Sequence, residues 1–197
     1  MIIKKHLILA SRSPRRQLLL KQLGLKFDVV ESGVDEDIDH IQIPIEHVTI
    51  LSQRKAIAVG KQVEDGFVIG ADTIVVLDGK ILGKPEDENE AIEMLSLLSD
   101  RTHTVFTGFT ILDRPSNKIY SDYETTDVTF RKIFIDEIKE YVRSGSPLDK
   151  AGAYGIQDDY GAVFVKKIDG CFYNVVGFPL TKFYLAIEKF QKELGLL

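Results

Sequence analysis

The stretch from Val68 to Lys80 constrains the fold of this chain more than any other. It reads VIGADTIVVLDGK, with apolar, β-branched runs on both sides of a Gly-Ala-Asp-Thr segment. Such runs predict a strand that is buried on both faces. A carboxylate in that strand, Asp72, is costly unless a metal ion or hydrogen bonds take it up. The small neighbours Gly70 and Ala71 would leave room for a ligand, although an Asp that ends a strand and caps a turn fits the same pattern.

Apolar runs alternate with helical patterns on both sides of this stretch. Ser13-Pro14 and Pro44 predict helix starts, and Asp78-Gly79 predicts a hairpin turn. Further helices are expected from about residue 86, from 136 and after 179. Strands are expected at residues 6–10, 27–30, 68–77, 102–112 and 119–130, with a hairpin of 162–168 and 172–176. The pattern predicts an α/β fold, a partly antiparallel mixed sheet with flanking helices, in a single domain over residues 1–197.

Composition narrows the class of protein. The net charge of −5 gives no overall basic field for nucleic acid. The single cysteine, Cys171, cannot form an internal disulfide, which fits a reducing compartment. No run approaches a membrane span, and the first apolar run is too short for a signal peptide. We therefore expect a cytoplasmic protein.

Polar and cationic residues gather where the first helix is expected to begin. Ser11, Ser13, Arg15 and Arg16 occupy this turn. Free backbone N–H groups and the helix dipole favour an anion there, whereas two arginines oppose the dipole. A phosphate ligand would make both arginines favourable, because guanidinium forks match phosphate oxygens. A solvated pair of surface arginines is the alternative, and no Walker or dinucleotide glycine pattern is present.

Carboxylates follow in a loop at Asp35, Glu36 and Asp37. Acidic loops are usually solvated. Together with Asp72, however, this loop could supply a second oxygen ligand for Mg²⁺ or Mn²⁺.

Two lysines and a glycine-rich loop complete the candidates. Lys55 falls on the same helical face as apolar residues, where a snorkelling side chain is the alternative, and Lys84 lies in a Gly-Lys-Pro turn. The segment from Asp149 to Gln157 carries glycines that permit tight turns near a ligand, or it is a surface connection. The Gln157 amide could complement the edge of uracil or thymine, and could flip to suit cytosine.

Taken together, these blocks resemble the Maf family of nucleotide pyrophosphatases. The resemblance runs in order from about His6 to the final helix. It implies an elongated mixed sheet with two lobes and a central groove, related to the inosine-triphosphate pyrophosphatase fold. The matching segments are residues 9–16, 51–56, 70–73, 83–85, 107–108 and 149–157.

The resemblance also implies an activity and a partner set. A nucleoside triphosphate is hydrolysed to the monophosphate and pyrophosphate with Mg²⁺ or Mn²⁺, in the branch that acts on dTTP and UTP and possibly on modified pyrimidine nucleotides. A house-cleaning role, a link to septum formation and a homodimer are further implications. Asp72 and Glu36 match the catalytic and metal-binding acidic positions. The implied substrate-binding residues are Ser11, Arg15, Arg16, Lys55, Thr73, Lys84 and Gln157.

Two other classes of function stay open from the sequence. A nucleotidyltransferase could use the same phosphate-binding groups with a phosphorylated acceptor in place of water. A non-enzymatic regulator of cell division could bind DNA or a protein, although the negative net charge argues against DNA.

Overall fold

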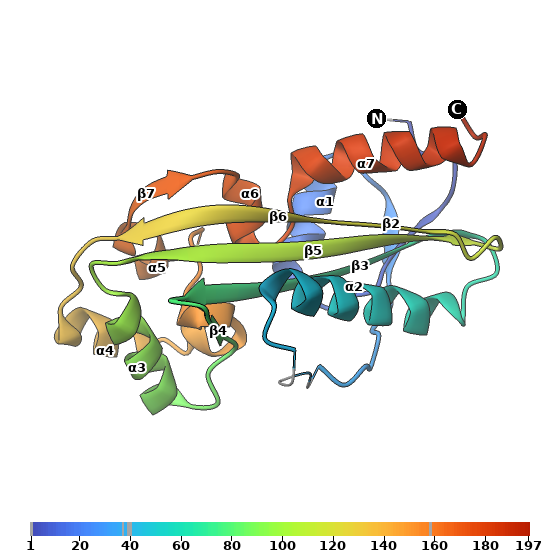
Figure 1. Cartoon of the computed structure of the whole chain (residues 1–197). Helices are drawn as coiled ribbons and strands as arrows, with labels where there is room; N and C mark the ends of the chain where they lie inside the picture. The colour runs from blue at the N-terminus through green and yellow to red at the C-terminus, as the bar shows by residue number, and fades with distance from the viewer. Residues whose placement is uncertain (1, 37, 39–40, 158) are drawn as a thin grey trace. The chain divides into compact units, whose positions relative to one another are not determined.

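The computed structural model describes residues 2–36, 38, 41–157 and 159–197, and its chain path is drawn in Figure 1. Its contacts divide the chain into two compact units. Unit 1 contains the residues up to Asp72, Thr107–Glu124 and Gly177–Leu197, and unit 2 contains Thr73–Phe106 and Thr125–Val176. The strand order of the mixed sheet is β2-β1-β3-β5-β6-β7, with β4 paired to β3. The predicted mixed α/β class is therefore confirmed.

Unit 1 is a layer of strands covered by helices on both faces (Figure 1). β1 pairs in parallel with β2 and with β3, so that Leu7 lies opposite both Phe27 and Phe67. On one face Ala56 and Val59 of helix α2 pack against the strands, and on the other α7 packs its aromatic rings. The elements are β1 Leu7–Leu9, α1 Pro14–Gln22, β2 Phe27–Val29, α2 Pro44–Gly60, α7 Leu180–Glu193 and parts of β3 Gly66–Leu77, β5 Thr102–Arg114 and β6 Ile119–Phe130.

Local signals set the helix ends of unit 1 as the sequence predicts. Ser13 caps α1 by accepting a hydrogen bond from the Arg16 backbone N–H, and Pro14 is its first residue. Gly24, with φ of +72°, stands just past its end. α2 begins at Pro44. These boundaries fix where Arg15, Arg16 and Lys55 leave the backbone.

Among the described residues, unit 2 contains the remaining parts of the three long strands, four α-helices and two 3₁₀ helices. Asp78 and Gly79 have φ of +50° and +78°, and they join β3 to β4 in the predicted antiparallel hairpin. The other elements are β4 Lys80–Leu82, α3 Glu88–Leu98, α4 Ile135–Arg143, the 3₁₀ helices Ser146–Asp149 and Ala151–Ala153, α5 Asp159–Phe164, β7 Val165–Asp169 and α6 Phe172–Val176.

The predicted hairpin across Asp169-Gly170 is wrong. β7 pairs with β6, with Asp169 opposite Asp127, and residues 172–176 form helix α6. The Asn174 side chain on α6 donates to the Val105 carbonyl oxygen and to Thr126 Oγ1, both at 3.0 Å. Short apolar runs of this kind do not distinguish strand from helix, so the tertiary contact decides.

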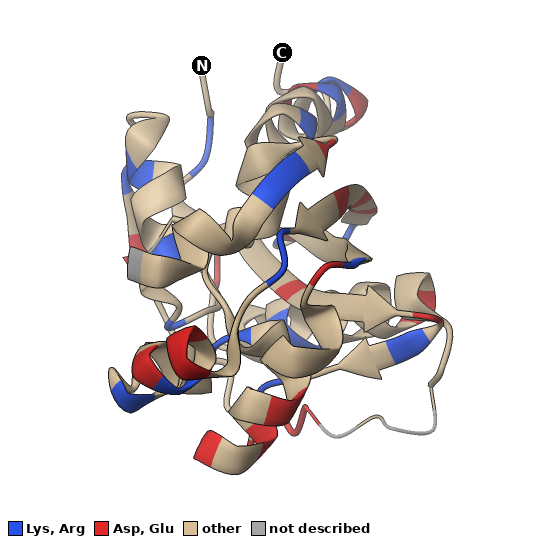
Figure 2. Cartoon of the chain, turned by 90° about the vertical axis from the view of Figure 1, so that its left-hand side faces the viewer, with Lys and Arg blue, Asp and Glu red and all other residues tan. Residues whose placement is uncertain are grey.

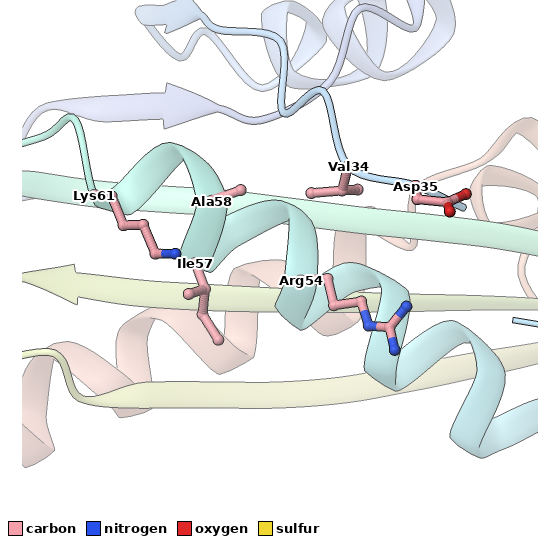
Figure 3. Close-up of a pocket in the computed structure, with 6 residues that line it drawn as sticks. All are labelled: Val34, Asp35, Arg54, Ile57, Ala58 and Lys61. Atoms are coloured by element: carbon pink, nitrogen blue, oxygen red, sulfur yellow. The ribbon is translucent and has the colours of Figure 1, made fainter. Parts of the chain in front are cut away.

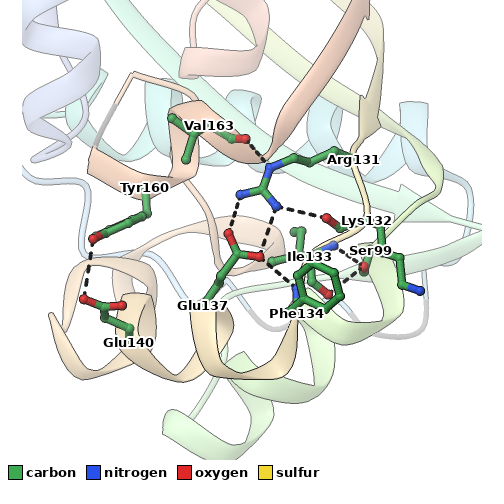
Figure 4. Close-up of polar contacts among 9 residues, drawn as sticks. All are labelled: Ser99, Arg131, Lys132, Ile133, Phe134, Glu137, Glu140, Tyr160 and Val163. Carbon is green, nitrogen blue, oxygen red and sulfur yellow. Dashed lines mark hydrogen bonds and ion pairs between the residues drawn. The ribbon is translucent and has the colours of Figure 1, made fainter.

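A bidentate ion pair holds the segment that connects β6 to α4 (Figure 4). Arg131 donates to both oxygens of Glu137, at 2.6 and 3.1 Å, and also to the Val163 carbonyl oxygen at 2.8 Å. Glu137 in turn accepts from the Phe134 backbone N–H at 3.0 Å. Arg131 lowers the pKa of Glu137 to about 2. This carboxylate belongs to the framework of unit 2, because none of its partners is a candidate site residue.

Within the described residues, no helix is long and apolar enough to cross a membrane.

Candidate active site

Two glycines let the strands of unit 1 lie directly against helix α2. A Cβ on Gly70 of β3 would lie 2.1 Å from the Ser52 carbonyl oxygen, and one on Gly108 of β5 would lie 2.6 Å from that of Val48. Any side chain at Gly70 would therefore push the helix away. The expectation that Gly70 leaves room for a ligand is wrong, because helix backbone fills that space.

The close packing brings Lys55 of α2 to Asp72 of β3. Lys55 Nζ lies 2.7 Å from Asp72 Oδ1, and the two residues are only 4% and 6% exposed. Asp72 lies inside a continuous strand, so the turn-cap alternative is wrong. The snorkelling alternative for Lys55 is also wrong, because its ammonium ends on a buried carboxylate. A buried charge of either sign needs such a partner.

Glu36 completes a three-residue ionic group. Lys55 Nζ lies 2.8 Å from Glu36 Oε1, and the Glu36 side chain is 49% exposed against 9% for Asp72. One buried ammonium thus holds two carboxylates together, one buried and one in contact with solvent. Asp37, the third residue of the predicted acidic loop, lies outside the described residues.

The start of α1 adds hydrogen bonds and positive charge. Arg16 donates from Nε to the Gly177 carbonyl oxygen at 3.0 Å and from Nη1 to Ser11 Oγ at 3.2 Å. Burial lowers the pKa of Arg16 and the charge of Arg15 adds to this effect, while Asp72 and Glu36 act in the opposite direction. Arg16 is therefore half-buried and electrostatically coupled to the carboxylates, and is not a solvated surface arginine.

These six side chains form what we call the charge cluster of unit 1. It contains three cations and two carboxylates, so it carries one surplus positive charge at neutral pH. Buried or half-buried cations act strongly on an anion because the local dielectric is low. The members are Ser11, Arg15, Arg16, Glu36, Lys55 and Asp72.

The remaining predicted residues lie in unit 2. Thr73 is half-buried in β3, and Lys84 and Gln157 are exposed. The Gly152 N–H donates to the Gly83 carbonyl oxygen at 2.9 Å, which joins the glycine-rich loop to the turn that carries Lys84. The structure thus brings the Lys84 turn and the Asp149–Gln157 loop together within one unit.

A separate hollow of about 400 Å³ lies on the outer side of α2 (Figure 3). Asp35 and Arg54 are among its lining residues. Arg54 lies beside Lys55 in the sequence, yet it lines this hollow while Lys55 bonds to Asp72. In the loop before α2, two neighbouring carboxylates likewise have different surroundings: Asp35 lines the hollow, and Glu36 forms an ion pair with Lys55.

The donor set fits a divalent metal that is shared with a substrate. Within the described part of the chain, no group of three or more His, Cys, Asp or Glu residues could hold a metal by itself. Asp72 and Glu36 both contact Lys55 Nζ, so the two carboxylates are neighbours in the folded chain. Mg²⁺ usually takes one or two carboxylates and keeps its other positions for water and phosphate oxygens. Two carboxylates beside three cationic side chains match that mode.

Two contacts, one at the start of α1 and one in the glycine-rich loop, have no signal that sequence reasoning could use. The Gly177 carbonyl oxygen accepts from Arg16 across 161 residues of chain. His103, an isolated polar residue on β5, forms a buried 2.7 Å hydrogen bond with Tyr154 of the glycine-rich loop. Only the folded chain shows either partnership.

Comparisons with known proteins found relatives that match nearly the whole chain. The dTTP/UTP pyrophosphatase of Pelotomaculum thermopropionicum is 47% identical over 186 residues, which cover 94% of this chain and 97% of the relative. That of Bacillus pumilus is 47% identical over 185 residues, covering 94% and 96%. A HAM1 protein from Coxiella burnetii matches 64% of this chain and 73% of its own, with a TM-score of 0.44 and 12% identity. The family model described as Maf-like protein matches residues 6–190, and the chain therefore belongs to the Maf family.

Proposed function

We propose that this chain hydrolyses dTTP and UTP to the monophosphate and pyrophosphate. The relatives named dTTP/UTP pyrophosphatase, matched over nearly the whole chain, support this activity. The observation that carries it is the buried Lys55 ammonium, held by Asp72 and Glu36 next to Arg16. The chain is then a hydrolase of acid anhydrides, a nucleoside triphosphate diphosphatase.

The reaction breaks the bond between the α-phosphorus and the oxygen that bridges to the β-phosphate. A water molecule attacks the α-phosphorus in line, and pyrophosphate leaves. Asp72 orients this water or takes its proton. The Lys55 hydrogen bond fixes Asp72 Oδ1, so the carboxylate is held in one orientation before the substrate arrives.

The cations stabilise charge on the triphosphate and on the leaving pyrophosphate. Arg15, Arg16 and Lys55 of unit 1 provide the positive charge for this stabilisation, and the Maf resemblance adds Lys84 to the substrate-binding residues. Arg16 is already fixed by the Gly177 carbonyl oxygen and Ser11 Oγ, so little reorganisation is needed.

Asp72 and Glu36 are the residues that would hold Mg²⁺ or Mn²⁺. The ion, when bound, supplies polarisation of phosphate oxygens and a more acidic water. Glu36 is half-exposed, so it can change partners without the desolvation cost that a buried carboxylate would carry.

The Maf resemblance matches Gln157, Thr73 and Arg16 to positions that separate the dTTP and UTP branch from the branch acting on methylated guanine nucleotides, so we assign base selection to them. The Gln157 amide donates to O4 of the pyrimidine and accepts from N3–H. A fixed amide orientation would discriminate against cytosine, which presents the opposite pattern. The same base edge extends the proposal to modified pyrimidine triphosphates that keep O4 and N3–H.

A nucleotide screen tests the proposal. The wild-type chain is incubated with each common ribo- and deoxyribonucleoside triphosphate, with Mg²⁺, Mn²⁺ or a chelator, and pyrophosphate is measured. We expect dTTP and UTP to be preferred and the chelator to abolish release. Orthophosphate as the first product, or release only with a phosphorylated acceptor, would overturn the proposal in favour of another hydrolase or a nucleotidyltransferase.

A house-cleaning role, a contribution to septum formation and a homodimer remain parts of the proposal that the Maf resemblance suggests. Lys and Arg residues and Asp and Glu residues are both spread over many elements of the cartoon in Figure 2, and the net charge is −5, which does not favour DNA as a partner. Titration with duplex DNA at low and moderate salt tests the DNA-binding alternative, since phosphate contacts would weaken steeply with salt. Sedimentation at micromolar concentrations tests the dimer.

A further inference from the structure

The glycine-rich loop of unit 2 is held in an unusual backbone conformation. Gly152 and Ala153 have φ of +67° and +59°, so two successive residues are left-handed. Left-handed backbone costs a non-glycine residue on the order of 1 kcal/mol or more, and persists only where the surroundings impose it. A Cβ on Gly152 would also lie 2.9 Å from Val75 Cγ2. The loop is therefore shaped by its contacts and not by local preference.

The turn sends one side chain of the loop inward and leaves another outside. Tyr154 follows in extended conformation and is only 5% exposed. Gln157, three residues later, is exposed. Only Gly155 and Ile156 separate the buried Tyr154 from the exposed Gln157.

Tyr154 is seated against His103 of β5 and Phe130 of β6. Tyr154 Oη and His103 Nε2 lie 2.7 Å apart and share a hydrogen bond, and His103 is 1% exposed. The Phe130 ring lies nearly perpendicular to both, with ring centroids 4.9 Å from His103 and 4.7 Å from Tyr154. The ring contacts and the hydrogen bond together restrict the orientation of the Tyr154 side chain.

This polar pair is a costly way to fill a core. Among the described residues, His103 Nδ1 has no hydrogen-bond partner, and an unsatisfied buried nitrogen costs about 1–3 kcal/mol. Two apolar side chains would avoid that cost but would not define the position of the loop. Burial lowers the pKa of His103 to about 4, although Asp127 acts in the opposite direction, so the imidazole is neutral at physiological pH.

Two further hydrogen bonds hold the loop on either side of Tyr154. The Gly152 N–H donates to the Gly83 carbonyl oxygen at 2.9 Å, and the Gly155 N–H donates to the buried Tyr141 Oη at 3.3 Å. Gln157 lies only two residues after Gly155 in the chain. The backbone that carries it is therefore tied to three separate elements.

We infer that the buried hydrogen bond between His103 and Tyr154 fixes the place from which Gln157 contacts the pyrimidine. His103 and Tyr154 are then positioning residues for substrate selectivity that act through Gln157. This inference rests on the proposed function, because it assigns the base contact to Gln157.

The test is Tyr154→Phe, which removes one hydroxyl and keeps the ring. Tyr160→Phe is the matched control, because the Tyr160 hydroxyl donates to Glu140 at 3.5 Å on the exposed surface (Figure 4). KM and kcat are measured for dTTP, UTP and dGTP, and hydrogen exchange is followed in the peptide of residues 150–157. His103→Phe removes the same bond from the other side, and His103→Gln keeps a hydrogen-bonding nitrogen.

We expect KM for dTTP to rise about fivefold in Tyr154→Phe, with kcat changed less than about twofold, as the loss of one buried hydrogen bond suggests. The preference for dTTP over dGTP falls by a similar factor, and the loop amides exchange faster. His103→Phe behaves alike, His103→Gln regains part of the preference, and Tyr160→Phe matches the wild type.

If the wild type releases pyrophosphate from dTTP, but Tyr154→Phe and His103→Phe both keep the wild-type KM and the preference for dTTP over dGTP, the proposed function stands and the inference is overturned. An equal loss of kcat on every nucleotide would also overturn it, since that result indicates only damage to the core. A wild type that acts on no nucleotide would overturn the proposed function, and the inference with it.

Discussion

Replacing Asp72 with Asn tests the central ion pair, because the change removes charge and keeps shape. The amide oxygen can still accept from Lys55, which lies 2.7 Å from Asp72 Oδ1. Removing one partner of a buried pair outright costs about 3–5 kcal/mol. Because Glu36 still pairs with the ammonium at 2.8 Å, we expect a smaller loss of about 1–2 kcal/mol in the free energy of unfolding. If Asp72 orients or deprotonates the water, kcat falls about 10²–10⁴-fold.

Unit 1 offers a matched control in a second lysine with two carboxylates. Lys5 Nζ lies 2.8 Å from buried Asp113 and 2.8 Å from exposed Asp65, with side-chain exposures of 5% and 69% for the two carboxylates. Asp113→Asn should therefore lose about as much stability as Asp72→Asn. It should keep kcat within about twofold, because none of these partners belongs to the charge cluster.

The assay measures pyrophosphate release from dTTP at a temperature at which urea denaturation shows all three proteins folded. Near-full turnover by Asp72→Asn would refute the role of Asp72. Equal losses of kcat in Asp72→Asn and Asp113→Asn, at equal losses of stability, would show that activity merely follows stability in this chain.

Three further predictions concern packing and pH. Gly70→Ala should lower the free energy of unfolding by about 3 kcal/mol or more, and lower activity, because the new Cβ would lie 2.1 Å from a backbone oxygen of α2. Gly83→Ala is the control, because the space around Gly83 is open, and it should unfold in urea like the wild type. Arg131 lowers the pKa of Glu137 from 4.5 to about 2, so the free energy of unfolding of the wild type should fall by about 1 kcal/mol as pH drops from 4.5 towards 2, a small loss because the pair is one-third exposed. Glu137→Gln should lack this loss when urea titrations at pH 6 and pH 3 are compared. Burial lowers the pKa of His103 from 6.5 to about 4, so on acidification the imidazole is protonated in the unfolded chain before it is protonated in the folded one. The free energy of unfolding should therefore fall by about 2 kcal/mol between pH 6.5 and 4.5, and His103→Phe should show a smaller fall over the same range.

Sequence reasoning succeeded where a neighbouring residue decides the structure. Ser13-Pro14 places the start of α1, and Asp78-Gly79 places the β3–β4 turn. Both depend on backbone angles and on hydrogen bonds within a few residues. The same reasoning singled out Asp72 and Lys55 as charges in apolar surroundings, which the structure confirms.

It failed where the deciding contact comes from far along the chain. The space beside Gly70 looked like room for a ligand, and only the packing of α2 shows that helix backbone fills it. Residues 172–176 looked like a strand, and the Asn174 hydrogen bonds to Val105 and Thr126 belong to a helix. No local pattern encodes contacts of this kind, since they require the fold to be known first.

The division of the chain into interleaved segments has a consequence for its synthesis. Unit 1 is completed only by Gly177–Leu197, whereas every residue of unit 2 has already been translated by Val176. All residues of unit 2 are therefore synthesised before α7, the last element of unit 1. The acceptor that fixes Arg16, the Gly177 carbonyl oxygen, is synthesised with that last segment, so a nascent chain that stalls before it should lack the hydrogen bond that holds the Arg16 side chain at the start of α1.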